Sequence, residues 1–340
     1  MRVGMSSIAL LRRGLCCLIL MALTRVAKPQ DTSSAERFLI PSPVPKLALI
    51  VGVEHYERVE RVQNAINDAA SMAQALRDVG FSVRFIADAT QDEIYDYTKD
   101  LVQRAGGEND PAIIVFYFAG HGFEDAARIP YMVPVSARAG ALIKDDSIPI
   151  LTVMNQLLAH RKAGLTIFFL DACRTDLGED SGNGDQSTIF RLDSGDGILG
   201  MSASAGFPAN SSAGVSINNG PYAYSLATYI PSLHRPLNEV LEEVEFDVKE
   251  LTRVPGFTEG QRTAVVTNAT YSKFYLNPQD EERKIELRSW QAALDSQQPR
   301  CVRKYIDRYH GSSFLRSALE WLATVAPIIP TSGGLECTDQ

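Results

Sequence analysis

The sequence reads AIIVFYFAGHG at residues 112–122 and LTIFFLDACR at residues 165–174. Each stretch opens with a run of apolar, mostly β-branched or aromatic residues, as a strand buried on both faces does. Each run then passes directly into polar residues, which include His121 in the first stretch and Cys173 in the second. Strands of this kind are typical of a parallel sheet covered by helices on both sides, so the two stretches predict an α/β fold.

The segments around these stretches alternate between strand and helix patterns. Residues 46–53 (KLALIVGV) are almost continuously apolar, and residues 64–80 place apolar side chains at helical spacing before a final glycine. Residues 81–87 predict a strand, and Thr90 with Glu93 predicts a capping box that opens the next helix. The remaining expected elements are a short hairpin strand at 131–135, a helix at 150–162, a strand at 198–203 and helices at 221–230 and 237–254. We therefore expect a three-layer fold with a mostly parallel central sheet and right-handed crossovers.

Sheets of this kind bind ligands at the carboxyl ends of their strands. His121 and Cys173 each follow a predicted strand, so both are expected at that edge. A thiol needs a base to become a thiolate near neutral pH, and that base must be close in space rather than in sequence. We predict that Cys173 is a nucleophile and His121 its general base. Taken singly, either residue could instead be a buried structural side chain.

The glycine after the histidine predicts where an oxyanion would bind. Gly122 has no side chain, so a substrate carbonyl can approach its backbone N–H. The N–H groups of Gly122 and Cys173 are then the expected oxyanion hole, in which one donor contributes roughly 3 to 4 kcal/mol in comparable sites.

Five stretches together resemble a known family: LALIVGVEHY, NAINDAASMAQALRDVGF, FYFAGHG, YMVPVSA and FFLDACR. Through them, residues 46–176 resemble the large-subunit region of caspases, most of all the metacaspase and paracaspase branch and its bacterial relatives. The resemblance implies a caspase-haemoglobinase fold and hydrolysis of peptide bonds through an acyl-enzyme on Cys173. The interval of about 50 residues between the histidine and the cysteine is also the one found in caspases.

The resemblance bears on substrate preference as well. True caspases help to bind an aspartate with an Arg in the helix after the first strand and a Gln two residues before the nucleophile, and this chain has Asp68 and Asp171 there. Acidic residues at these places resemble the basic-specific branch and would pair with a substrate Arg or Lys. We expect a peptide or protein substrate that is cleaved after a basic residue. The alternatives are an exposed helix charge for Asp68 and a loop-supporting carboxylate for Asp171.

The amino-terminal residues 1–29 predict a targeting segment. Arginines precede a short apolar run at 14–23, which is typical of a signal peptide and too short to span a bilayer comfortably. We expect an exported protein, periplasmic or secreted. The alternatives are an uncleaved membrane anchor through residues 14–27 and a cytosolic protein.

The rest of the chain divides into three expected regions. Residues 30–45 form a linker rich in Pro and Ser, residues 46–276 the peptidase domain, and residues 277–340 a C-terminal helical extension. The extension has the pattern of a helical hairpin or a single helical repeat, which cannot bury its own apolar face. It should therefore pack on the main domain or on a protein partner.

Charge and motifs exclude several other classes of protein. A formal net charge of −8 argues against a nucleic-acid partner, because phosphates are bound by clustered Lys and Arg. The chain has no Walker loop, no GxGxxG after the first strand, no HExxH and no GxSxG. We expect no cofactor and no metal ligand set. Calcium activation, which some metacaspases need, stays open, but no ligand can be assigned. The acidic residues after Cys173 could bind calcium, yet their spacing matches no calcium loop: Asp176, Glu179, Asp180 and Asp185.

The sequence is compatible with several alternatives. The chain could be a catalytically idle caspase-like binding or signalling module, although the presence of both Cys173 and His121 argues against this. It could also be a peptidase of the same fold that cuts after Asn or Asp. Self-cleavage after Arg174 or Arg191 is a further hypothesis. Cys301 and Cys337 either pair in an oxidising compartment or are two unrelated thiols.

Overall fold

A computed structural model describes most of the chain. The described residues are 37–39, 41–107, 110–125, 129–158, 164–172, 196–202, 218–253, 260–269, 271, 273–325 and 337. The expected targeting segment, Cys173, the acidic residues after it and both proposed self-cleavage sites lie outside these ranges. Within them, no helix is long and apolar enough to cross a membrane.

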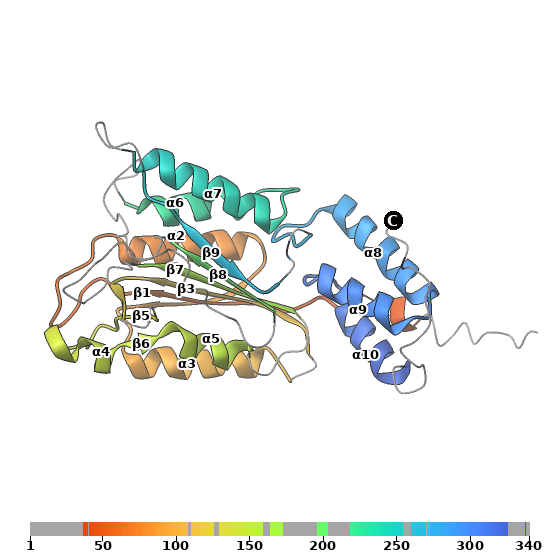
Figure 1. The fold of residues 1–340 in the computed structure, drawn as a ribbon, viewed down its shortest axis with the longest axis horizontal. Helices are drawn as coiled ribbons and strands as arrows, with labels where there is room; N and C mark the ends of the chain where they lie inside the picture. The colour runs from red at the N-terminus through yellow and green to blue at the C-terminus, as the bar shows by residue number, and fades with distance from the viewer. Residues whose placement is uncertain are drawn as a thin grey trace, which may run out of the picture.

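A six-stranded sheet forms the centre of the protein (Figure 1). In spatial order its strands are β2 (Ser82–Ala87), β1 (Lys46–Gly52), β3 (Ala112–Ala119), β7 (Gly164–Asp171), β8 (Gly197–Met201) and β9 (Ala264–Thr267). Neighbouring strands are parallel except β8 and β9, which are antiparallel. All eight residues of β3 are buried, which accounts for its unbroken apolar sequence. The predicted α/β fold with a mostly parallel sheet is confirmed.

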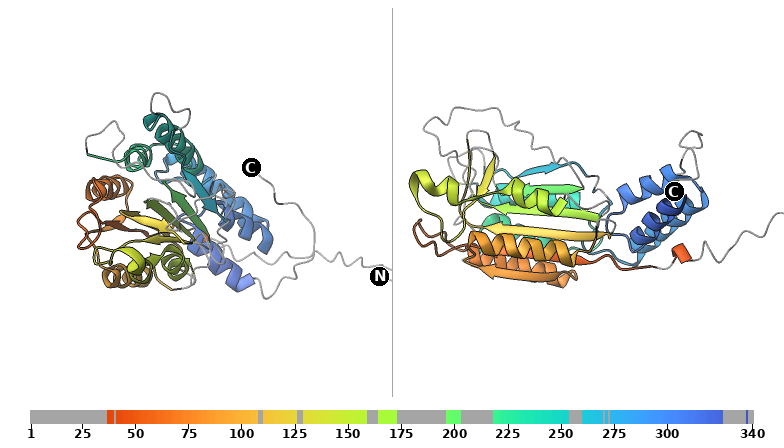
Figure 2. Two further views of the ribbon diagram at one scale, coloured as in Figure 1. Left: turned by 60° about the vertical axis from the view of Figure 1, so that its left-hand side comes forward. Right: turned by 90° about the horizontal axis from the view of Figure 1, so that it is seen from below.

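Helices cover both faces of this sheet, as Figures 1 and 2 show. One face carries α2 (Ala65–Asp78), α6 (Pro221–Tyr229) and α7 (Leu237–Leu251), and the other carries α3 (Gln91–Arg104) and α5 (Ile150–Leu158). A small antiparallel sheet of β4 (Gly122–Glu124), β5 (Pro130–Met132) and β6 (Ile148–Pro149) lies beyond the end of β3. Two short helical segments, Gly140–Leu142 and α4 (Ile143–Asp146), precede β6.

Local sequence signals account for where the main helices begin and end. The capping box is present at α3, because the Thr90 hydroxyl accepts from the backbone of Glu93 and the Glu93 carboxylate accepts from the backbone of Thr90. Helix α2 is followed by Gly80, whose φ of +86° suits a residue without a side chain. At Gly52, a Cβ would lie 2.7 Å from the carbonyl oxygen of Ala65, so α2 packs directly against the end of β1.

Three helices form a unit of their own after the sheet. They are α8 (Asp280–Asp295), α9 (Pro299–Arg308) and α10 (Leu315–Val325), so the expected helical hairpin or single repeat is a three-helix unit. Its apolar cluster surrounds Trp290, which is fully buried. Phe38 belongs to the same cluster, and its carbonyl oxygen accepts a 2.8 Å hydrogen bond from the Trp290 indole. Part of the segment expected as a linker therefore packs within this unit.

The helical unit meets the sheet at the amino ends of its strands (Figure 1). Lys46, the first residue of β1, donates at 2.7 Å to the carbonyl oxygen of Leu276, on the segment of the sheet domain that leads into α8. Arg316 pairs with Asp110, just before β3, at 2.6 Å. The contact between the two parts thus lies at the edge of the sheet opposite to the carboxyl ends of the strands.

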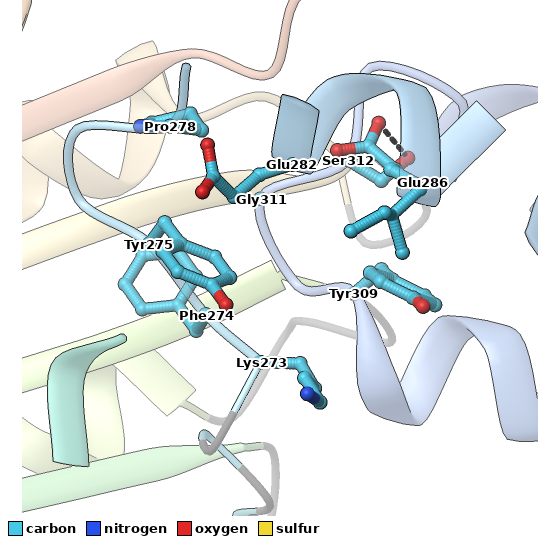
Figure 3. Close-up of a pocket in the computed structure, with 10 residues that line it drawn as sticks. Lys273, Phe274, Tyr275, Pro278, Glu282, Glu286, Tyr309, Gly311 and Ser312 are labelled. Carbon is cyan, nitrogen blue, oxygen red and sulfur yellow. Dashed lines mark hydrogen bonds between the residues drawn. The ribbon is translucent and has the colours of Figure 1, made fainter. Parts of the chain in front are cut away.

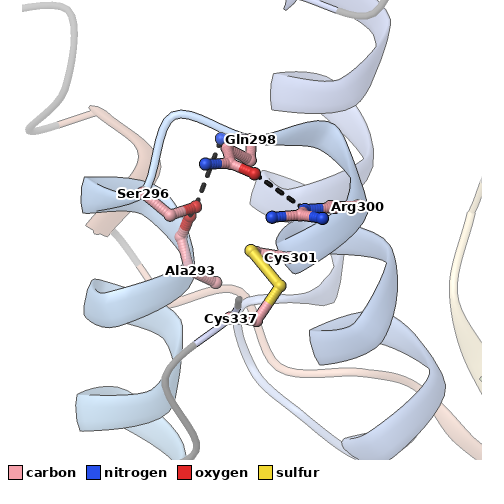
Figure 4. The surroundings of a disulfide bond; sticks show 6 residues. All are labelled: Ala293, Ser296, Gln298, Arg300, Cys301 and Cys337. Carbon is pink, nitrogen blue, oxygen red and sulfur yellow. Dashed lines mark hydrogen bonds between the residues drawn. A yellow bond between two sulfur atoms is a disulfide. The ribbon is translucent and has the colours of Figure 1, made fainter. Parts of the chain in front are cut away.

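A disulfide links Cys301 in α9 to Cys337 (Figure 4). Their Cα atoms are 5.6 Å apart and 36 residues separate them in sequence. The sequence left open whether these cysteines are paired or are unrelated thiols, and in the structure they are paired. The bond ties the end of the chain to the helical unit.

Candidate active site

The carboxyl ends of β3 and β7 carry the two expected catalytic residues. In the parallel pairing of these strands Ala119 lies opposite Asp171. The backbone N–H of Gly120 continues the contact by donating to the carbonyl oxygen of Asp171 at 3.3 Å. His121 comes two residues after Ala119, and Cys173 two residues after Asp171. His121 is described and half-buried, whereas Cys173 lies just beyond the last described residue of that stretch.

The imidazole of His121 is bonded to the loop that follows β1. Its Nε2 lies 2.7 Å from the carbonyl oxygen of Glu60. A carbonyl oxygen can only accept, so this contact assigns the proton to Nε2. In the neutral imidazole the lone pair is then on Nδ1, the nitrogen that can take a proton from a neighbouring group.

The backbone of His121 is held by a cycle of hydrogen bonds. Its N–H donates to the hydroxyl of Tyr56 at 2.7 Å, and that hydroxyl donates to the carbonyl oxygen of Val133 at 3.2 Å. The N–H of Val133 donates back to the carbonyl oxygen of His121 at 3.0 Å. The aromatic ring of Tyr56 also packs on the imidazole, with ring centroids 4.8 Å apart.

The residue before the histidine must be glycine for this contact to form. A Cβ at Gly120 would lie 2.6 Å from the hydroxyl oxygen of Tyr56 and 3.1 Å from the carbonyl oxygen of Val53. Real Cβ atoms do not come so close to other atoms, so any larger residue would displace Tyr56 or the histidine. The first glycine of the GHG motif thus makes room for the tyrosine hydroxyl.

Asp88, which follows β2, anchors the loop that carries Tyr56 and Glu60. Its Oδ1 accepts the backbone N–H groups of Glu54 and His55 at 2.8 and 2.9 Å, and its Oδ2 lies 2.9 Å from Nδ1 of His55. Burial opposes ionisation of Asp88, but these hydrogen bonds outweigh it and lower its pKa. Asp88 also has a φ of +50°, a conformation that is costly for a residue with a side chain.

Asp68 lies inside the protein, and only 4% of its surface is exposed. Its Oδ1 accepts the backbone N–H of Gly220 at 2.8 Å and the side-chain amide of Asn219 at 3.1 Å. Burial and the nearby negative charge of Asp171 raise the pKa of Asp68 to about 8. The alternative of an exposed helix charge is therefore wrong for this residue.

Asp171, the last residue of β7, lies close to Asp68. Its Oδ2 accepts the hydroxyl of Tyr117 at 3.0 Å, and Ser202 and the backbone N–H of Ala223 also donate to it. Burial raises its pKa to about 6 against the effect of these donors. Two carboxylates from separate elements thus share one environment beside the start of α6. Neither forms an ion pair with any of the residues that the structure describes.

Several groups around the site could not be found by sequence reasoning. Tyr117, Ser202 and Asn219 each contact one of the two carboxylates, but their spacing in the chain carries no signal of this. The carbonyl of Glu60 acts through the backbone, which any residue provides. Tyr56 stands in one of the stretches that resemble caspases, so its presence could be noted but not its contact with His121. In the described parts of the chain, no three His, Cys, Asp or Glu residues gather as a metal site needs.

A hollow also lies at the joint between the sheet domain and the helical unit (Figure 3). It encloses about 490 Å³, its open mouth included, between the segment before α8, α8 itself and the turn after α9. Aromatic side chains and two carboxylates line it, among them Tyr275, Tyr309, Glu282 and Glu286. Ser312 donates to the Glu286 carboxylate at 2.7 Å, so this acid already has a partner within the unit. The hollow is on the side of the molecule away from His121.

The fold and the edge of the sheet define a class of protein. A mostly parallel sheet between helices, with a histidine after β3 and a cysteine shortly after the adjacent β7, is the arrangement of a caspase-like hydrolase. A family model of the caspase domain, peptidase family C14, matches residues 45–275. The chain belongs to this family, and the predicted resemblance to caspases is confirmed.

Two curated relatives match part of the chain. They are the human mucosa-associated lymphoid tissue lymphoma translocation protein 1 and its mouse homologue. Each is 25% identical over 130 residues, which are 38% of this chain and 15% of the relative. The matched region is thus a small part of the length of these relatives.

Proposed function

We propose that this chain is a cysteine endopeptidase in which Cys173 attacks the peptide bond, His121 is the general base, and the bond that is cut follows Arg or Lys. The observation that carries the catalytic part is the bond from His121 Nε2 to the Glu60 carbonyl, because it leaves Nδ1 free to accept a proton. The register of β3 and β7 supports the pairing of the two residues. Two residues of chain reach at most about 7 Å, so Cys173 cannot be far from Asp171.

The chemistry follows from these groups. Nδ1 of His121 takes the proton of the Cys173 thiol, and the thiolate attacks the carbonyl carbon of the scissile bond. The tetrahedral intermediate collapses as the C–N bond breaks, and the imidazolium returns its proton to the leaving amine. His121 then removes a proton from water, which attacks the thioester carbon. Collapse of this second intermediate releases the carboxyl product and returns the proton to the sulfur.

The negative charge on the carbonyl oxygen needs donors during both attacks. The N–H groups of Gly122 and Cys173 are the proposed oxyanion hole. Gly122 begins β4 immediately after His121, so its backbone is attached to the same clamped segment as the base. This supports a fixed distance between the proposed base and the proposed donor.

The buried Asp68 and the half-buried Asp171 support the preference for a basic residue. Burial raises the pKa of both Asp68 and Asp171, so each carries its charge at a cost while no cation is bound. A guanidinium or ammonium group would remove this cost, and the planar guanidinium could contact both acids. A substrate aspartate would instead add a third negative charge. The alternative role of the two acids is to hold the start of α6, which they already contact.

The disulfide supports a location outside the reducing cytosol. Disulfides persist in secreted and periplasmic proteins and are rare where thiols are kept reduced. Together with the apolar run at 14–23, the bond between Cys301 and Cys337 supports an exported protein. A protein partner bound through the C-terminal helices remains a prediction.

Covalent labelling tests the proposed nucleophile and pocket together. A peptide with a thiol-reactive group after Arg should modify the protein once, and digestion with mass spectrometry should locate the label on Cys173. The same reagent with Asp or Asn at that position should react at least about 100-fold more slowly. Asp would add a third negative charge, at a cost of several kcal/mol, and Asn would leave both acids without a cation. The Cys173→Ala variant is the control and should take up no label. Equal labelling by all reagents, or a label that persists in this variant, would count against the proposal.

A further inference from the structure

We propose that Tyr56 is a positioning residue for the general base, through its hydroxyl group. The inference rests on the proposed function, because it concerns the histidine that would act as base. It is carried by one juxtaposition: the hydroxyl lies between the backbone N–H of His121 and the carbonyl oxygen of Val133. A hydroxyl oxygen can accept from the first and donate to the second through one atom.

The hydroxyl closes a cycle that fixes where His121 leaves the sheet. The segment turns away from β3 at Gly120 and enters β4 at Gly122, so the base stands at a change of direction. Without the hydroxyl, the N–H of His121 would lose its partner, while its carbonyl oxygen would keep the bond from Val133. The backbone could then rotate at the histidine. A shift of the order of 1 Å in a catalytic group can cost about 100-fold in rate.

The tyrosine is itself held by anchors that do not involve His121. The loop from Glu54 to Val62 closes on itself through the N–H of Val62 and the carbonyl oxygen of Glu54 at 3.2 Å. Asp88 accepts the N–H groups next to Tyr56, and the N–H of Glu57 donates to the carbonyl oxygen of Val135 at 3.0 Å. The hydroxyl is thus presented from a braced loop, as a positioning group requires.

The environment keeps this hydroxyl protonated. Burial raises the pKa of Tyr56 well above its usual value, and the charge of Asp88 raises it further, although the bond from His121 acts against this. The group therefore remains both donor and acceptor over the pH range in which a peptidase works.

The test compares Tyr56→Phe with Tyr131→Phe in the full chain. Tyr131 packs in the same apolar cluster as Tyr56, and its hydroxyl donates to Asp125 at 3.3 Å and not to His121. With an Arg peptide, Tyr56→Phe should lower kcat about 10-fold to 100-fold and leave KM within about twofold, because Asp68 and Asp171 are untouched. Tyr131→Phe should change neither. A kcat for Tyr56→Phe within twofold of that for Tyr131→Phe would overturn the proposal.

A second measurement separates this inference from the proposed function. The ¹⁵N signals of the His121 imidazole, read in the Cys173→Ala background, report which ring nitrogen carries the proton. They should show Nε2 protonated with Tyr56 present and a mixture of tautomers with Tyr56→Phe. If the unaltered chain cleaves no peptide, the proposed function fails, and this spectrum alone decides the role of Tyr56. Identical spectra with and without the hydroxyl would then overturn the inference.

Discussion

Asp68 and Asp171 meet beside the start of α6, one from the first covering helix and one from the end of β7. Burial raises the pKa of both acids, the charge of Asp171 raises that of Asp68 further, and a bound cation would oppose both effects. Binding of a cationic substrate should therefore depend on pH near neutrality, which a single surface acid would not cause.

We predict that KM for an Arg peptide falls as the pH rises from about 5.5 to 8. The pKa values of Asp171 and Asp68 are raised to about 6 and about 8, so both acids hold protons at the lower end of this range. A guanidinium binds the ionised forms of Asp68 and Asp171. At higher pH fewer protons have to leave these two acids when the substrate binds, so binding becomes tighter. The measurement is KM at half-unit steps of pH, with Asp68→Asn as the variant that should flatten the upper part of the curve.

A neutral substrate provides the control for that profile. A peptide with citrulline in place of Arg has nearly the same shape and no charge, so its KM should be high and almost independent of pH. A flat profile for the Arg peptide, or the same slope for citrulline, would contradict a role of the two acids in binding.

Among single residues, the sequence allowed a functional prediction only where the residue type has few chemical roles. His121 and Cys173 could be singled out because each follows a buried strand and few side chains can serve as base or nucleophile. Asp68 and Asp171 needed the resemblance to caspases, since carboxylates are common on surfaces. Tyr56 and the Glu60 carbonyl could not be assigned, because their role depends on where a loop returns to the sheet.

Among the elements, the C-terminal helices are cross-linked by a covalent bond. The disulfide from Cys301 to Cys337 closes a loop of 36 residues and joins the end of the chain to α9. Cross-links of this length restrict the unfolded chain and so stabilise the folded one.

We predict that Cys337→Ser lowers the free energy of unfolding of the helical unit by about 3 to 4 kcal/mol. Hydrogen exchange of α9 and α10 measures this, because it reports the stability of separate parts of a protein. A reducing agent should weaken the unaltered chain by a similar amount and leave the variant unchanged. If the variant exchanged as slowly as the unaltered chain, the bond would not stabilise this unit.

Elements were predictable where their pattern was strong. The apolar runs at β1, β3 and β7 and the capping box at α3 all appear in the structure. β9 was missed, because its four residues alternate between half-buried and exposed at the edge of the sheet. Pairing with β8 makes this short segment a strand, and local sequence does not reveal such pairing.

Across the whole molecule, the helical unit and the proposed catalytic site lie at opposite edges of the sheet. Lys46 and Arg316 make contacts at the amino ends of the strands, whereas His121 follows a carboxyl end. Strands of seven or eight residues separate these edges by about 25 Å. A change within the helical unit should therefore affect stability without altering substrate contacts.

We predict that Trp290→Ala lowers the free energy of unfolding by about 3 to 5 kcal/mol, as for other buried aromatic residues. The indole is fully buried, and its N–H bond to Phe38 would be lost as well. KM for an Arg peptide should stay within about twofold at a temperature where the variant is folded. Thermal unfolding and peptide kinetics on the same sample check both parts, and a large rise in KM would contradict the separation of the two edges.

We propose that this member of the caspase family cuts peptide bonds after basic residues, with Cys173 as the nucleophile. The most direct measurement is hydrolysis of four matched fluorogenic peptides that end in Arg, Lys, Asp or Asn, by the chain and by its Cys173→Ala variant, with and without calcium. We predict turnover of the Arg and Lys peptides that disappears in the variant. No turnover of any peptide in either condition, or turnover that survives in Cys173→Ala, would contradict the claim.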